Sequence, residues 1–222
     1  MAERWVPLFP LGLVLMPKEA LPLHIFEPRY RALTERCERE QIPFGVVWAR
    51  EEGLAEVGTE AWIQETLRRF PDGRRDILTV GGDRFRVRAL REHDAGYLEA
   101  RLESLDEEEE TIDANSAALL LELHRECRRL GLVMQQGLGA PEVPLPPEEG
   151  AEEIAVAPGY TFLVAAAGPL GPSERQAVLE MTSESARESA LLGLLARQRP
   201  RLEHAVQDLP HVKANGKVKP RE

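Results

Sequence analysis

The sequence predicts an α+β protein, in which short and mostly antiparallel strands form a small barrel or sandwich and a set of helices follows. Up to about residue 105, apolar and polar side chains alternate as in half-buried strands, and turn residues separate the segments. From about residue 115 onward, apolar residues recur with the period of an amphipathic helix. The acidic run 106–110, DEEEE, resists packing and is expected to divide the chain into two units.

One helix is expected to interrupt the strands of the first unit. Residues 20–26, ALPLHIF, have the pattern of a strand, and Pro28 then occupies a position where the first turn of a helix tolerates proline. Glu27 lies at the positive end of the helix dipole. The stretch PLHIFEPRYR is therefore expected to join a strand to a helix over residues 28–40. The predicted apolar face of this helix contains Tyr30, Leu33 and Cys37.

Turn residues predict two hairpins in the same unit. Pro71-Asp72-Gly73 lies between the strand-like runs AWIQETLRRF and DILTV, where it favours a tight turn. Gly81-Gly82-Asp83 precedes the clearest alternation in the chain, DRFRVRAL, and a second hairpin is expected there because glycine adopts positive φ angles easily. The segments FGVVW and YLEARLESL complete the predicted strands.

The second unit is predicted to be a helical bundle. Ser173 and Gln176 have the spacing of a capping box, which predicts a helix of about ten residues. The other expected helices span residues 115–135, 157–167 and 184–197, with an exposed loop rich in Pro, Gly and Glu at 137–153. The expected division is a β unit at 1–110, a helical unit at 111–209 and a disordered basic tail at 210–222.

Composition favours a cytoplasmic protein without a membrane segment. The longest apolar runs are far shorter than the roughly 20 residues that span a bilayer. Pro7 and Pro10 interrupt the apolar amino-terminal stretch, which argues against a secretory signal. Cys37 and Cys127 lie in helical patterns far apart in sequence, as expected of reduced, buried thiols. The net charge of −10 disfavours nucleic acid as a general partner.

The residues provide little support for catalysis. The chain has no P-loop, and its four lysines leave almost no candidate for a serine-lysine dyad. His124 and Cys127 have the spacing of two metal ligands, but a packed thiol beside a surface imidazole is the simpler interpretation. His24 is expected to be half-buried and hydrogen-bonded, although a hydrolase that depends on it stays an open hypothesis. We expect no enzymatic activity, no cofactor and no metal.

Two surfaces are candidates for binding. Trp62 faces away from Ala61 and Ile63, so its indole could form an apolar contact patch with Trp48 or Phe70. Burial of Trp62 beneath a helix is the competing interpretation. Residues 68–91 hold eight arginines against three aspartates, which suits a solvated strand face or a patch for phosphate, RNA or an acidic partner. The arginines of this alternative patch are Arg68, Arg69, Arg74, Arg75, Arg84, Arg86 and Arg88.

Several motifs together resemble the amino-terminal, substrate-binding domain of Lon proteases, especially its stand-alone and cereblon-like relatives. Those relatives carry a PLF-P segment, a P-L-H-x-F-E-x-R-Y segment, a V-G-T strand and a G-x-R-F hairpin. The corresponding positions here are Pro7–Pro10, Pro22–Tyr30, Val57–Thr59 and Gly82–Phe85. The helical stretch from Tyr160 to Arg197 is also similar, so the resemblance covers nearly the whole chain apart from the linker and the tail.

The resemblance implies a PUA-like β-barrel followed by a helical bundle. It also implies a module that recognises polypeptide segments or unfolded proteins, with a protease acting in trans as a further partner. In full-length Lon, separate ATPase and serine-lysine protease modules perform the chemistry, and we expect this chain to lack both. The expected function is therefore non-catalytic polypeptide binding, with RNA binding through the arginine-rich region as the alternative.

Overall fold

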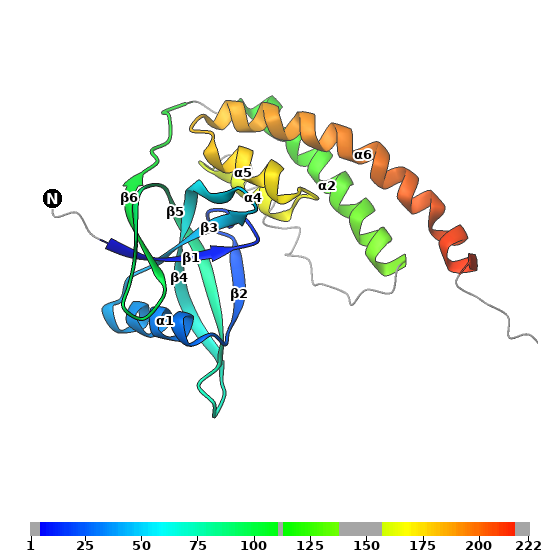
Figure 1. The fold of residues 1–222 in the computed structure, drawn as a ribbon. Coiled ribbons are helices and arrows are strands. Elements are labelled where there is room, and N and C mark those ends of the chain that lie inside the picture. Colours follow the sequence, from blue (N-terminus) through cyan, green and yellow to red (C-terminus); the bar gives the residue numbers. More distant parts are fainter. Residues whose placement is uncertain (1–4, 111–112, 138–156, 216–222) are drawn as a thin grey trace, which may run out of the picture. The chain divides into compact units, whose positions relative to one another are not determined.

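The computed structural model describes residues 5–110, 113–137 and 157–215, and these form two compact units (Figure 1). The first unit contains the described residues up to Glu109 together with Gly171–Ser183. The second contains the described residues from Glu110 to Leu170 and from Glu184 onward. The segment Gly171–Ser183 therefore differs from the expected division, which assigned all of residues 111–209 to the helical unit.

A six-stranded, mostly antiparallel sheet builds the first unit, as the sequence predicts. The strands are β1 (Trp5–Leu11), β2 (Ala20–Ile25), β3 (Phe44–Arg50), β4 (Gly53–Arg69), β5 (Arg75–Glu92) and β6 (Leu98–Ser104). Their order is β2-β5-β4-β3-β1-β6, and β6 also pairs with β5. The pairing path β5-β4-β3-β1-β6 thus returns to β5, while β2 extends it at one edge. The β1–β3 pair is parallel and the other pairs are antiparallel.

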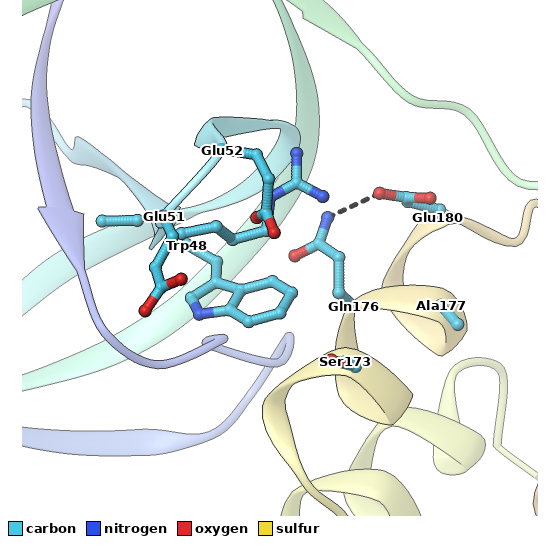
Figure 2. Close-up of a pocket in the computed structure, with 9 residues that line it drawn as sticks. Trp48, Glu51, Glu52, Ser173, Gln176, Ala177 and Glu180 are labelled. Carbon is cyan, nitrogen blue, oxygen red and sulfur yellow. Dashed lines mark hydrogen bonds between the residues drawn. The ribbon is translucent and has the colours of Figure 1, made fainter.

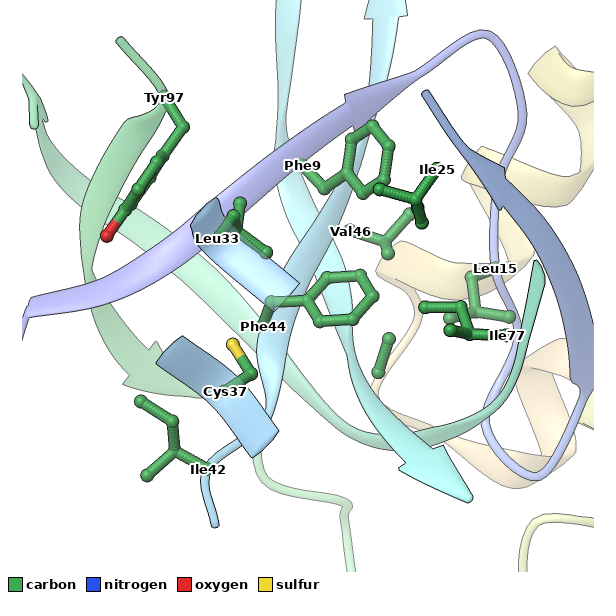
Figure 3. Packing of buried hydrophobic residues seen from close by; sticks show 11 residues of the cluster. Phe9, Leu15, Ile25, Leu33, Cys37, Ile42, Phe44, Val46, Ile77 and Tyr97 are labelled. Atoms are coloured by element: carbon green, nitrogen blue, oxygen red, sulfur yellow. The ribbon is translucent and has the colours of Figure 1, made fainter. Parts of the chain in front are cut away.

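The predicted strand-to-helix junction is confirmed. Strand β2 ends at Ile25, and helix α1 (Pro28–Glu40) begins at the expected proline. Gln41 ends this helix in the left-handed conformation, with φ of 52°. The apolar face of α1 packs into the core that Figure 3 shows. Fully burying a side chain such as Leu33 stabilises the fold by about 1.5–3 kcal/mol. The centre of this core contains Phe9, Leu33, Cys37, Phe44 and Ile77.

The turn at Pro71-Asp72-Gly73 is confirmed, whereas the hairpin expected at Gly81-Gly82-Asp83 is wrong. Gly73 has φ of +85°, and its amide donates to the Phe70 carbonyl at 3.0 Å. Strand β5, in contrast, runs without a turn through Gly81 and Gly82. A Cβ on Gly81 would lie 2.1 Å from the Met16 carbonyl oxygen. This glycine therefore permits close approach of another backbone segment, which is a common use of glycine within a strand.

Helix α5 (Pro172–Glu180) belongs to the first unit because side chains of the sheet bind it. Arg84 is 5% exposed, and its guanidinium donates to the carbonyls of Leu179 at 2.6 Å and Met181 at 2.7 Å. The helix begins at Pro172, after Gly171, so Ser173 lies inside the first turn rather than at the N-cap. Glu174, not Gln176, accepts the Gly171 amide hydrogen, at 2.9 Å.

The second unit contains α2 (Ala114–Gly137), α4 (Tyr160–Ala167) and α6 (Glu184–Asn215), which contact one another. Helix α6 passes the expected end at residue 197 and continues through residues 210–215, where we expected disorder. Ion pairs at i, i+4 support this extension, between Arg199 and Glu203 and between His204 and Asp208. Residues 216–222 of the expected tail and 138–153 of the expected loop lie outside the described residues. None of the described helices is long and apolar enough to cross a membrane.

Buried polar groups connect the elements of the second unit. Arg187 is fully buried, stacks on the Phe162 ring at 4.2 Å and donates to the Thr161 hydroxyl at 2.9 Å. Glu184 accepts the amide of Gly159 at the start of α4, at 2.9 Å, and the Thr161 hydroxyl hydrogen at 2.6 Å. Although burial opposes its charge, these hydrogen bonds and the Arg187 guanidinium hold the pKa of Glu184 below its usual range.

Candidate functional site: a groove beside helix α5

An open groove of about 690 Å³ lies within the first unit, between the β3–β4 hairpin and helix α5 (Figure 2). One wall carries the Trp48 indole and the charged residues of the hairpin. The other wall is one face of α5, whose residues repeat at helical spacing. The lining residues are Trp48, Ala49, Arg50, Glu51, Glu52, Ser173, Gln176, Ala177 and Glu180.

The hairpin wall follows from the local sequence of β3 and β4. Arg50 pairs with Gly53, whose φ of +124° closes the tight connection between the strands. The register shifts between Val47 and Ala49, so Trp48 lies at a β-bulge. Bulges change the direction of a side chain relative to a regular strand. Trp48 is consequently half-buried and lines the groove, instead of packing wholly into the core or pointing freely into solvent.

The helix wall contains a buried polar side chain, that of Gln176. Its amide nitrogen donates to the Val57 carbonyl at 3.1 Å and to the Glu180 carboxylate at 2.8 Å. These two bonds fix the orientation of the side chain, which is 4% exposed. The Gln176 Oε1 atom accepts no hydrogen bond from any described residue. An unpaired buried acceptor lowers the stability of a fold by about 1–3 kcal/mol. Such acceptors are rare in folded proteins, so this one calls for an explanation.

The rim of the groove is acidic. Glu51, Glu52 and Glu180 contribute three carboxylates, and Arg50 contributes one guanidinium. Arg50 lies 5.6 Å from the centroid of the Trp48 ring in a cation–π contact. Glu51 and Glu52 are exposed residues in the turn between β3 and β4. The groove thus offers an aromatic face, hydrogen-bond acceptors and negative charge.

The three aromatic residues predicted to form one contact patch lie in different places. Trp62 is 41% exposed on β4, and its ring lies against Gly82 of β5. Phe70 lies at the end of the β4–β5 hairpin, where Arg68 and Arg74 stack on its ring at 4.5 and 5.2 Å. Only Trp48 lines the groove. The prediction that Trp62 exposes its indole is consistent with this arrangement, whereas its patch with Trp48 or Phe70 stays a prediction.

The arginine-rich region is largely engaged by the protein itself. Arg75 and Arg84 are buried, and Arg75 donates to Glu38 at 2.7 Å and to the Arg31 carbonyl at 3.0 Å. The exposed members mostly lie beside acidic or aromatic neighbours. The ion pairs are Arg69–Glu38, Arg74–Asp72, Arg86–Glu56 and Arg88–Glu103, while Arg68 stacks on Phe70. A phosphate or RNA patch from these arginines stays a prediction, and two of its seven members face the interior.

The candidate histidines have structural surroundings. The Nδ1 atom of His24 lies 2.6 Å from Asp76 Oδ1, and its side chain is 45% exposed, in agreement with the expected hydrogen-bonded role. His124 is 7% exposed, so the expectation of a surface imidazole is wrong. Helix α2 contacts α4 as well as α6, and the backbone of Ala167 in α4 forms a hydrogen bond with this imidazole. Cys127 is buried as predicted. In the described part of the chain, no three His, Cys, Asp or Glu residues form a group that could hold a metal.

Sequence reasoning missed the helix wall of the groove. It interpreted Gln176 as part of a cap and gave Glu180 no role. No local pattern identifies either residue, because β4 supplies the carbonyl partner of Gln176 from 119 positions away in the sequence. The hairpin wall was partly recognised, through Trp48.

Comparison with known proteins identifies relatives of this chain. The family model of the ATP-dependent protease La (LON) substrate-binding domain matches residues 5–197. The Lon protease of Anaeromyxobacter dehalogenans (strain 2CP-C) is 30% identical over 203 residues, which cover 87% of this chain and 23% of that protein. Lon protease 2 of Myxococcus xanthus is also 30% identical over 203 residues, which cover 87% of this chain and 24% of the relative. The chain thus spans about a quarter of the length of the curated relatives that it matches.

Solved structures agree on the fold. The Lon N-terminal domain protein from Xanthomonas campestris superposes with a TM-score of 0.64 at 24% identity, over 87% of this chain and 98% of that one. The N-terminal domain of Lon protease from the Mycobacterium avium complex gives 0.58 at 18% identity, with the same coverage of each chain. Because the family match extends over both units, the chain belongs to the family of the Lon protease substrate-binding domain.

Proposed function

We propose that this chain is a non-catalytic polypeptide-binding module and that the groove beside α5 is its binding surface. The observation that carries this proposal is the pairing of the half-buried Trp48 indole with the unpartnered Gln176 carbonyl in one open groove. Apolar side chains of a polypeptide could pack on the indole, and a backbone N–H or a side-chain donor could satisfy the carbonyl. Membership of the substrate-binding family supports this proposal.

We further propose that any cleavage of a bound polypeptide is performed by a protease acting in trans. Within these 222 residues there is no P-loop motif, and only four residues are lysines. Both features argue against an ATPase or a serine-lysine protease within the sequence described here. A purified sample that hydrolyses ATP or an unfolded protein by itself would contradict this part of the proposal.

The finer fold assignment is part of the same proposal. We propose that the first unit is a PUA-like β-barrel and that the helices of the second unit form a bundle. The β5–β6 pairing, which closes the path of strands, supports the barrel. The contacts among α2, α4 and α6 support the bundle.

The binding proposal can be tested with one polypeptide in two states. Fluorescein-labelled lysozyme that has been reduced and alkylated remains unfolded, whereas native lysozyme has the same sequence in a folded state. We expect the chain to bind the unfolded form and not the native form, as measured by fluorescence anisotropy. Truncation of a central aromatic contact often weakens binding by about 2 kcal/mol or more. We therefore expect Trp48→Ala to bind at least about tenfold more weakly.

The matched control is Trp5→Ala, which removes another half-buried indole that lies outside the groove. This variant should bind unfolded lysozyme as the unaltered chain does. Equal binding by Trp48→Ala and the unaltered chain would exclude the groove as the binding surface. Equal binding of native and unfolded lysozyme would exclude recognition of unfolded polypeptide.

A further inference from the structure

The groove contains more acceptors than donors. Of its charged lining residues, three are carboxylates and one is a guanidinium, which leaves a formal excess of two negative charges. The Arg50 guanidinium lies over the Trp48 ring. Glu180 accepts a hydrogen bond from the neutral Gln176 amide and forms no ion pair with another described residue. The carboxylates therefore remain available to a cation from outside.

The Gln176 carbonyl adds an independent observation that indicates the type of ligand. The two hydrogen bonds of the Gln176 amide nitrogen, to Val57 and Glu180, prevent a simple exchange of the amide's donor and acceptor ends. The Oε1 atom must therefore act as an acceptor, and it has no partner among the described residues. In Figure 2 the Gln176 side chain extends from α5 toward the hairpin wall that carries Trp48 and Glu52. A ligand that satisfies this atom has to bring an N–H or O–H donor.

We infer that the groove selects polypeptide segments in which a lysine or arginine lies next to an apolar residue. This inference rests on the proposed polypeptide-binding function and names the chemistry of the segment. The cationic side chain donates to Gln176 Oε1 and is neutralised by the acidic rim, and its apolar neighbour packs on the Trp48 ring. Because Oε1 is shielded from water in the unbound chain, side chains that line the groove have to move aside when the segment enters.

A polypeptide fits these features better than an anionic ligand does. A phosphate or a nucleic acid would meet the carboxylates of Glu51, Glu52 and Glu180 and would be repelled. A purely apolar segment would leave the Gln176 acceptor unpaired in a still drier environment, which costs binding free energy. A basic and apolar segment satisfies the acceptor, the charge and the indole together.

Three matched peptides test the inference. Each is a fluorescein-labelled dodecapeptide of alternating leucine and serine, with lysine, glutamine or glutamate at one central position. Charge-assisted hydrogen bonds are about twice as strong as neutral ones, so we expect the lysine peptide to bind about tenfold or more tightly than the glutamine peptide. The glutamate peptide should bind most weakly of the three. The preference for lysine should decrease as salt is raised, since part of it is electrostatic.

The rim is tested with Glu51→Gln/Glu52→Gln, a pair of exposed substitutions that should not impair folding. This variant should lose most of the preference for lysine while retaining its affinity for the glutamine peptide. The matched control is Glu65→Gln/Glu92→Gln, which removes the same charge at exposed positions outside the groove. It should retain the preference. Equal losses in both double variants would show attraction to net charge alone and would overturn the inference.

Gln176→Met tests the unpaired acceptor, because methionine has a similar shape but no amide. We expect it to weaken binding of the lysine peptide more than that of the glutamine peptide, with its folding checked by thermal unfolding. If Gln176→Met impairs folding, the Glu51→Gln/Glu52→Gln variant decides whether the groove selects basic segments. If all peptides bind equally to the unaltered chain, the selectivity for basic segments is wrong and the proposed function stands. If neither peptides nor unfolded lysozyme bind, the proposed function fails as well.

Discussion

His124 shows how one buried residue can make the stability of the second unit depend on pH. The imidazole is 7% exposed, and its Nε2 atom has no hydrogen-bond partner among the described residues. Burial, followed by the positive charge of Arg128, lowers the pKa of His124 to about 4 from its ordinary value of 6.5. A hydrogen bond with the Ala167 backbone opposes this shift. The folded chain therefore keeps this imidazole neutral at pH values where the unfolded chain protonates it.

The sign of the pH effect follows from that difference. Because the folded pKa is below the unfolded value, the unfolded state binds more protons between about pH 6.5 and pH 4. The contribution of His124 to stability is thus complete above about pH 6.5 and decreases as the pH falls toward 4. A difference of about two and a half pKa units corresponds to a loss of about 3 kcal/mol over that range.

We expect His124→Gln to reduce this loss, because glutamine does not titrate. Hydrogen exchange of the α2 amides in the full chain, measured between pH 7.5 and pH 4.5, follows the opening of this unit. The control is His204→Gln, because the side chain of His204 is 77% exposed. This variant should show the same loss of protection at low pH as the unaltered chain. A His124→Gln variant with the same loss of protection at low pH as the unaltered chain would contradict this account.

Among the elements, strand β5 demonstrates the limit of local patterns. The glycine pair at 81–82 predicts a turn by the usual rule, and the structure shows one continuous strand from Arg75 to Glu92. The reason is non-local: the Gly81 amide donates to the Glu19 carbonyl at 2.9 Å, and its own carbonyl accepts from the Lys18 amide at 2.7 Å. Sequence patterns did predict α1, the turn at Pro71-Asp72-Gly73 and the alternation of residues 83–90, because these depend on near neighbours.

Gly81→Ala tests this explanation of the strand. The added methyl group would collide with the Met16 carbonyl, and overpacking of this kind costs about 1–3 kcal/mol. We expect a lower urea midpoint for unfolding of the first unit, monitored by tryptophan fluorescence. Gly12→Ala is the control, since no atom lies within 4 Å of its added Cβ, and its effect should stay within about 0.5 kcal/mol. Equal midpoints for the two variants would show that the close approach at Gly81 is not required.

On the scale of the whole molecule, the first unit is discontinuous in sequence. Residues 171–183 return to it after the first helices of the second unit. Several long-range interactions fix this return segment: Gln176 bonds to Val57, Arg84 binds the end of α5, and the Glu108 amide donates to the Thr182 carbonyl at 2.9 Å. The groove exists only because this segment lies against the β3–β4 hairpin.

The discontinuity predicts the behaviour of fragments. A fragment of residues 1–110 lacks α5, so the buried Arg84 guanidinium loses its carbonyl acceptors and the apolar face under Val178 and Leu179 is exposed. The ion pair of Arg84 with Glu107 is retained in this fragment, so the destabilisation comes from the two lost hydrogen bonds and from the lost apolar burial. We expect this fragment to unfold at a clearly lower temperature than a fusion of residues 1–109 to 171–183 through a flexible Gly-Ser linker. Circular dichroism measures both, and equal unfolding temperatures would contradict the assignment of α5 to this unit.

The sequence alone determined the α+β class, the junction from strand to helix and the resemblance to the Lon substrate-binding family. These features depend on periodicity and on motifs of adjacent residues, which are local. The tertiary structure decided that residues 171–183 join the sheet, that Gly81 lies within a strand and that His124 is buried. It also placed Gln176 opposite Trp48, far apart in sequence and in one groove. Such contacts depend on which surfaces pack together, and the pattern along the chain does not contain that information.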